Sequence, residues 1–181
     1  KVGELRLKTL SEMDALTGVL NRAAFIEQVE RLMRESKNDA RHALMMLDVD
    51  GFKKVNDVFG HSVGDQALID ISQALRGTLR RGDLLGRLGG DEFIVVLDDI
   101  PGDAAAADKA GRICDLVRKA FSAQVQISAS VGIALSPRDG TDFETLYRKA
   151  DGALYHVKGT GKDNFAFYRS DMEAARIEPS A

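Results

Sequence analysis

The sequence contains no tryptophan, a single cysteine, three prolines and no long apolar run. The lone Cys114 excludes an intramolecular disulfide framework and is compatible with a reducing compartment, so we expect a cytoplasmic location. No apolar stretch approaches the roughly 20 residues of a transmembrane helix, and no signal peptide is visible. The net charge of −3 argues against a general nucleic-acid binder, because such proteins are usually basic.

What remains is the composition of an ordinary globular domain. With 181 residues, 44% of them hydrophobic, the chain is long enough to bury a core. The chain begins with Lys1 rather than Met, so we expect a piece of a longer protein. Residues 1–13 are interpreted as a linker, either the end of a signalling helix from an upstream sensory domain or a frayed terminus. We place one domain at 14–169 and a loose tail at 170–181.

Apolar spacing predicts alternating helices and strands. Helices are expected at 25–36, 52–59, 68–79, 106–120 and 143–157, and strands at 43–47, 84–88, 93–97, 125–135 and 165–168. Elements of both kinds interleave without strict alternation, so the predicted fold class is α/β (α+β), a central mixed sheet with flanking helices.

One hairpin organises the chain. The apolar run 93–97 is typical of a strand buried on both faces, and Gly89-Gly90 before it suits a two-residue turn. Two acids, Asp91 and Glu92, stand beside this buried strand. Partly desolvated carboxylates repel each other unless a cation or hydrogen-bond donors compensate, and a divalent metal is the simplest compensation. The alternative is that Asp91 is an ordinary turn acid.

The run from Gly89 to Phe93 resembles the motif that names the GGDEF domains, the diguanylate cyclases. Further blocks in the family's order extend the resemblance from Asp14 to about Asn164, although Ala23 replaces a second arginine that is common in the family. The resemblance implies a palm-like nucleotidyl cyclase fold with the first long strand beside the hairpin. It also implies that two GTP become cyclic di-GMP and two pyrophosphates, in a homodimer of half-sites with Mg²⁺, for which Mn²⁺ could substitute.

The family match implies a metal site made by Asp48, the backbone carbonyl of Val49 and Asp91. Mg²⁺ commonly takes one or two carboxylates together with water and substrate phosphates. Asp91 is also a candidate general base, and Glu92 is expected to assist a second metal or to hydrogen-bond nearby. Taken alone, Asp48 could instead cap a helix.

Directly after Asp48 the sequence suits a phosphate site. Exposed N–H groups at a helix start attract anions, and the resemblance implies that the main chain of Gly51 and Phe52 holds the β- and γ-phosphates. Lys53 is expected to neutralise charge as pyrophosphate leaves. Lys158 and Lys162 match the family's late basic pair, which reaches the triphosphate. The alternative for each lysine is a solvated surface charge.

Two further pairs match family positions. Asn56 and Asp65 match the guanine-binding residues, and an ionised Asp can accept from the N1–H and N2–H₂ donors of guanine. Their alternative role is capping of turns or helices. Arg80 and Asp83 resemble the product-inhibition site for cyclic di-GMP, since arginine binds phosphate and stacks on bases. The alternative here is a charged turn.

Two other functions stay open at this point. One is a catalytically idle GGDEF domain that senses GTP or cyclic di-GMP. The other is an interaction module without a nucleotide, which the clustered acids disfavour.

Overall fold

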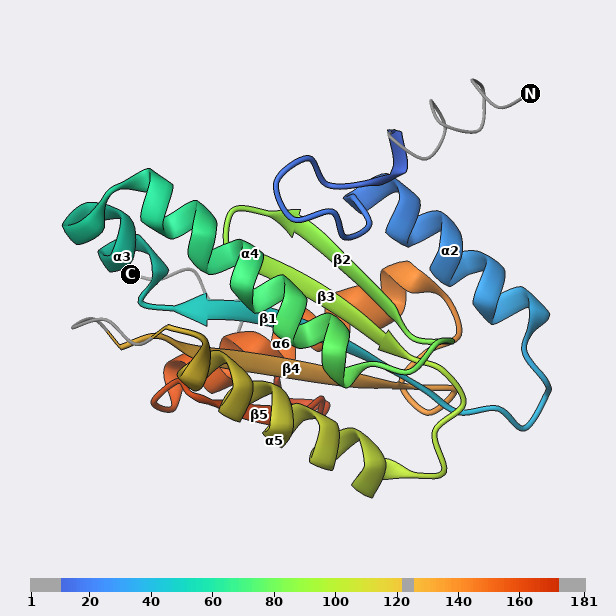
Figure 1. Ribbon diagram of the computed structural model, residues 1–181. Coiled ribbons are helices and arrows are strands. Elements are labelled where there is room, and N and C mark those ends of the chain that lie inside the picture. Colours follow the sequence, from blue (N-terminus) through green and yellow to red (C-terminus); the bar gives the residue numbers. More distant parts are fainter. Residues whose placement is uncertain (1–10, 122–125, 173–181) are drawn as a thin grey trace, which may run out of the picture.

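A computed structural model describes residues 11–121 and 126–172 of the chain (Figure 1). The predicted linker at 1–13 and tail at 170–181 lie mostly outside these residues. In chain order the elements are α2 (Arg22–Glu35), β1 (His42–Asp50), α3 (Phe52–Phe59), α4 (His61–Thr78), β2 (Leu84–Gly89), β3 (Glu92–Leu97), α5 (Asp103–Ala120), β4 (Ser128–Ser136), α6 (Phe143–Gly159) and β5 (Asn164–Phe167). None of the helices in this part of the chain is both long and apolar enough to cross a bilayer.

Within the described residues, five strands form one sheet in the order β2-β3-β1-β4-β5. The β4–β5 pair is parallel, whereas β1 pairs antiparallel with β3 and β4, and β2 pairs antiparallel with β3. The predicted mixed sheet is confirmed, and the first long strand does lie beside the hairpin.

Helices cover both faces of this sheet. Alternate β1 residues Met45, Leu47 and Val49 pack in the core under α3, α4 and α5, while Leu44 and Met46 pack in the core under α2 and α6. Figure 1 shows α4 and α5 in front of the sheet and α6 behind it. Because side chains alternate along a strand, the even-numbered acids at the end of β1 project on the α2 and α6 side.

The position of α6 depends on Gly132 in β4. A Cβ at this residue would lie 2.0 Å from the carbonyl oxygen of Ala150 and 2.3 Å from the backbone N of Leu154, both in α6. Pairing with β1 continues without interruption through Gly132, so the glycine allows close helix approach and makes no bulge.

The hairpin turn lies one residue later than predicted. Gly89 still pairs with Glu92, and the register shifts between Arg87 and Gly89, so the two-residue turn is Gly90-Asp91. Gly90 has φ 50°, a left-handed conformation that glycine adopts without strain. The shift places Asp91 inside the turn.

Candidate functional site

The predicted metal residues meet where β1 ends and the hairpin turns. Asp48 lies opposite Glu92 in the β1–β3 register, and the Val49 N–H donates to the carbonyl oxygen of Asp91 at 3.2 Å. Both Asp48 and Asp91 line one cavity of about 420 Å³. The other lining residues are Val49, Asp50, Gly51, Phe52, Lys53, Lys54, Asp57, Lys158 and Lys162.

Asp48 is a buried carboxylate that is not fully satisfied. It is 7% exposed, and within the described residues its Oδ1 has no hydrogen-bond partner, while Oδ2 forms an ion pair with Lys158 Nζ. A buried oxygen without a partner is costly, and a cation would satisfy it. Asp48 lies within β1, so the helix-cap alternative is wrong.

Asp91 is half-buried in the turn. Burial, together with the negative charge of Asp50, raises the pKa of the Asp91 carboxyl, and the charge of Arg87 opposes this rise. A group that is costly to ionise in the free protein gains from a nearby cation.

The donor set fits a magnesium ion that keeps water and phosphate ligands. No group of three or more His, Cys, Asp or Glu side chains that could hold a metal occurs in residues 11–121 and 126–172. Two carboxylates, with the unpartnered Asp48 oxygen between strand and turn, match the usual protein contribution to a Mg²⁺ site. Glu92 is exposed and begins β3 on the face of Asp48.

Asp50, which the sequence reasoning left without a role, holds the site together. Its carboxylate accepts hydrogen bonds from Ser128 Oγ at 2.8 Å, from Ser130 Oγ at 2.8 and 2.9 Å, and from the Asp163 N–H at 3.2 Å. These bonds tie the end of β1 to β4 and to the loop after α6. Its period-2 spacing from Asp48 was the signal that could have found it.

The start of α3 forms the floor of the cavity. Gly51 is its N-cap with φ 79°, and no side chain of the described residues caps this end. The first N–H groups of a helix have no intrahelical partner, so the backbone at Gly51 and Phe52 stands where an anion could bind. The predicted phosphate residues therefore line the same cavity as the acids.

The two late lysines also line this cavity. Lys158 is in the last turn of α6, and Lys162 lies in the following loop, where its N–H donates to the Val157 carbonyl at 3.0 Å. Burial and the nearby charge of Lys162 lower the pKa of Lys158. Two cations on one rim suit a triphosphate.

Asn56 and Asp65 are in helices α3 and α4, and neither is at a cap position, so the capping alternative is wrong for both. In the described part of the chain, Asn56 Oδ1 is buried without a partner. It faces Gly64, where an added Cβ would lie 2.9 Å from Asn56 Cγ. Neither residue lines the 420 Å³ cavity, so the structure does not bring them together with the acids and lysines there.

Arg80 and Asp83 behave differently from each other. The Asp83 side chain is fully buried and accepts from the backbone N–H groups of Arg80 at 2.8 Å and Asp98 at 2.9 Å. Arg80 is 60% exposed, lies 3.7 Å from Asp83 and donates to the Asp98 carbonyl. Both line a cavity of about 550 Å³ with Arg76 and Arg81. Residues 80–83 form a turn in which the side chains of Arg80 and Arg81 are exposed to solvent.

Arg87 connects the N-terminal loop to the hairpin, and the sequence analysis missed it. Its Nη1 lies 3.1 Å from Asp14 Oδ2, and its Nε and Nη2 donate to the Gly90 carbonyl at 3.0 and 2.7 Å. Asp14 also accepts from the N–H and Oγ1 of Thr17. One guanidinium therefore fixes the residue that precedes Asp91.

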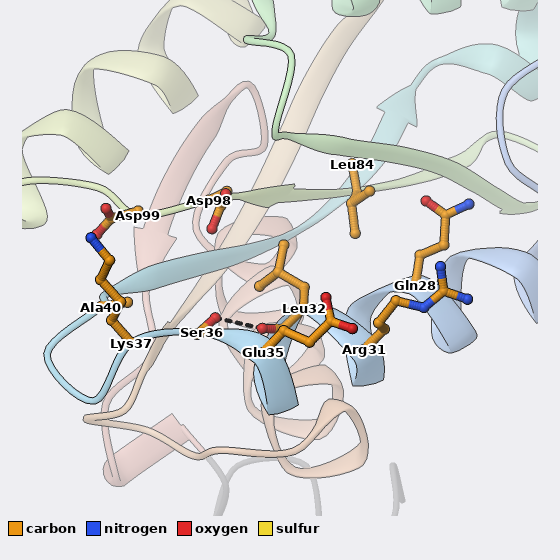
Figure 2. Close-up of a pocket in the computed structure, with 10 residues that line it drawn as sticks. All are labelled: Gln28, Arg31, Leu32, Glu35, Ser36, Lys37, Ala40, Leu84, Asp98 and Asp99. Carbon is orange, nitrogen blue, oxygen red and sulfur yellow. Dashed lines mark hydrogen bonds between the residues drawn. The ribbon is translucent and has the colours of Figure 1, made fainter.

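A separate cavity of about 400 Å³ lies at the far end of the strands (Figure 2). Figure 2 shows Arg31 and Glu35 of α2 on one side and Asp98 and Asp99, which follow β3, on the other. None of the predicted site residues lines it, and its charges are of both signs. The clustered acids and lysines at the end of β1 remain the candidate site.

The mixed sheet, with acids where its central strand ends and the hairpin turns, is the palm-like fold of nucleotidyl cyclases. The chain belongs to the family described as "Diguanylate cyclase, GGDEF domain", whose profile matches residues 11–164.

Relatives with different activities share this domain. The chain is 38% identical over 164 residues to the bifunctional diguanylate cyclase/cyclic di-GMP phosphodiesterase MucR of Pseudomonas aeruginosa, covering 89% of this chain and 24% of MucR. It is 38% identical over 176 residues to the cyclic di-GMP phosphodiesterase PdeR of Escherichia coli, covering 96% of this chain and 26% of PdeR. The chain thus spans about a quarter of each relative's length. The GGDEF domain of TpbB from Pseudomonas aeruginosa is similar in structure, with a TM-score of 0.81, 32% identity, and coverage of 92% of this chain and 99% of that one.

Proposed function

We propose that this chain is a diguanylate cyclase domain that condenses two GTP into cyclic di-GMP and two pyrophosphates. The observation that carries the proposal is the convergence of Asp48 and Asp91 with the uncapped start of α3 and with Lys158 and Lys162 around one cavity. Its volume of about 420 Å³ is within the usual range of small-molecule sites.

Asp48, the Val49 carbonyl and Asp91 would hold Mg²⁺ or Mn²⁺. Such an ion, when bound, offsets phosphate charge and acidifies a nearby hydroxyl. We assign Asp91 to the metal first and to proton removal second, because a carboxylate that holds a metal is a weak base. Glu92, on the same face as Asp48, is proposed to support this cluster.

The chain's other residues orient the nucleotide. N–H groups of Gly51 and Phe52 would bind the β- and γ-phosphates, with Lys53, Lys158 and Lys162 balancing their charge. Asn56 and Asp65 would read guanine. Positioning and charge stabilisation are the main contributions to catalysis in phosphoryl-type transfers.

The reaction needs two copies of the domain. Each 3′-hydroxyl attacks the α-phosphorus of the other GTP; one P–O bond forms, the bond to the β-phosphate breaks, and pyrophosphate leaves. A symmetric product fits a two-fold dimer of half-sites, transient when the domain is alone. We expect an upstream sensory domain to supply further dimer contacts and place the reaction in the cytoplasm.

The second candidate is a catalytically idle domain that binds GTP or cyclic di-GMP as a signal. The name of PdeR favours it, because this relative is as similar as MucR and is called a phosphodiesterase alone.

One assay separates the candidates. Purified protein is incubated with GTP and Mg²⁺, and products are separated by chromatography, with Asp91→Ala as the test variant and Asp108→Asn, on the exposed side of α5, as the control. Cyclic di-GMP from the parent and the control but not from Asp91→Ala supports the cyclase. Binding of GTP, or of separately added cyclic di-GMP, without turnover supports the idle sensor, and absence of binding to both nucleotides refutes both candidates.

A further inference from the structure

The ion pair between Asp48 and Lys158 joins two residues that the proposed reaction needs apart. Asp48 is assigned to a metal and Lys158 to a triphosphate, yet Lys158 Nζ contacts Asp48 Oδ2 in the structure. The other oxygen of the Asp48 carboxylate, Oδ1, is buried and lacks a hydrogen bond from any described residue. The Lys158 ammonium therefore pairs with Oδ2 of Asp48, while Oδ1 has no partner among the described residues.

The backbone that carries Lys158 is fixed beside Asp48. The close contact of α6 with Gly132 sets the helix on the sheet, and the loop after it is tied to Asp50 through the Asp163 N–H. The lysine side chain is 38% exposed, however, while that of Asp48 is 10% exposed. The carboxylate therefore cannot turn to solvent, but the ammonium can leave it.

A buried carboxylate without a counterion is strongly unfavourable, so some cation is needed at Asp48 in every state. In the free protein the structure supplies Lys158. A lysine ammonium at Oδ2 and a divalent ion bound to the same carboxylate compete for the single negative charge of Asp48. Phosphate oxygens give the ammonium another partner, and three rotatable donors allow it to move there.

We propose that Lys158 is a counterion switch: it holds Asp48 while the site has no nucleotide, and an incoming triphosphate draws it away and opens Asp48 to a divalent cation. The inference rests on the proposed function of the site and adds an order to it. Nucleotide and metal then bind with positive coupling that passes through one side chain. Free Mg²⁺ without nucleotide therefore binds less tightly than it does beside a triphosphate.

The test uses Mn²⁺ as the probe, followed by its electron paramagnetic resonance signal during titration of nucleotide-free protein. Lys158→Met keeps the apolar stem and removes the competing charge. We expect it to bind Mn²⁺ roughly two- to fivefold more tightly than the parent, the scale of one partly exposed ion pair. Lys54→Met removes a positive charge from the same cavity with no ion pair to Asp48, and it should change the affinity less than twofold.

Two further arms define the mechanism. In an Asp48→Asn background, Lys158→Met should lose its effect on Mn²⁺ affinity. A non-hydrolysable GTP analogue should tighten Mn²⁺ binding more in the parent than in Lys158→Met, because only the parent has a lysine to displace.

Equal or weaker Mn²⁺ binding by Lys158→Met would overturn the switch. An equal gain in Mn²⁺ affinity from Lys54→Met would also overturn it, because that would indicate a general effect of the positive charge in the cavity. A gain from Lys158→Met that persists in the Asp48→Asn background would overturn it as well. These readouts need no turnover, so an inactive domain can still confirm the switch. Conversely, if the domain is an active cyclase and Lys158→Met leaves its Mn²⁺ affinity unchanged, the proposed function stands and the counterion switch is refuted.

Discussion

Replacing Gly64 by alanine should impair guanine binding while leaving the fold intact. A Cβ at Gly64 would lie 1.8 Å from Asn56 Oδ1, 2.9 Å from Asn56 Cγ and 3.3 Å from Phe52 Cζ. The Asn56 amide must then move by roughly 1.5 Å to regain ordinary contact distances, and a misplacement of even about 1 Å can cost about 100-fold at a reacting site.

For binding alone the expected loss is smaller. An amide moved off the base would forfeit about 1–3 kcal/mol of hydrogen bonding, which corresponds to a roughly 5- to 150-fold weaker affinity. The affinity for a non-hydrolysable GTP analogue is measured by calorimetry, with the ATP analogue in parallel. We expect the GTP affinity to fall toward that of ATP.

Gly77 supplies a matched control in the same helix. A Cβ there meets nothing within 4 Å, so Gly77→Ala should leave GTP binding unchanged and stabilise α4 by up to about 1 kcal/mol. If Gly64→Ala keeps the parent's GTP affinity while Asn56→Ala loses it, the space at Gly64 is not what positions the amide. If Asn56→Ala also keeps it, Asn56 does not read the base.

Arg87→Lys should lower the melting temperature by several degrees and reduce turnover, because lysine cannot bridge Asp14 and the carbonyl before Asp91; unchanged melting would show that the bridge contributes little. Burial lowers the pKa of His42 from 6.5, so the folded state favours the neutral imidazole, and stability present above pH 6.5 is lost as the pH falls below it. His42→Gln should therefore flatten the fall in unfolding free energy between pH 6.5 and 5 in urea titrations; equal slopes would contradict this. Arg80→Ala should weaken cyclic di-GMP binding in calorimetry at an unchanged melting temperature, whereas Asp83→Asn should lower the melting temperature, because Asp83 is fully buried. The opposite pattern would make Asp83 the ligand.

The periodic part of this fold could be predicted from the sequence. Continuous apolar runs in β1 and β3, and helical spacing in α5 and α6, located these elements to within a few residues, because each pattern reports the burial of its own side chains. The predicted hairpin turn, Gly89-Gly90, lies one residue before the observed turn, Gly90-Asp91. A glycine pair does not specify which of its members still pairs across the strands, and here Gly89 does.

Long-range polar contacts could not be predicted in this way. Arg87 meets Asp14 across 73 residues of sequence, and Ser130 meets Asp50 across 80. Neither pair leaves a periodic signal, because each depends on where the sheet places two distant segments. The resemblance to a family supplied ligands and substrate residues, but it was silent on the side chains that hold them.

Asp48 and Asp50 illustrate how the surrounding structure, and not residue type, would decide which acid takes a cation. They stand two residues apart on the same face of β1. Asp50 accepts hydrogen bonds from two serine hydroxyls and a backbone N–H, so its negative charge is already stabilised without an ion. Asp48 has one oxygen that no described residue hydrogen-bonds and one movable lysine. A divalent ion therefore gains more at Asp48, while the fixed charge of Asp50 raises the pKa of Asp91 and makes a cation there more favourable.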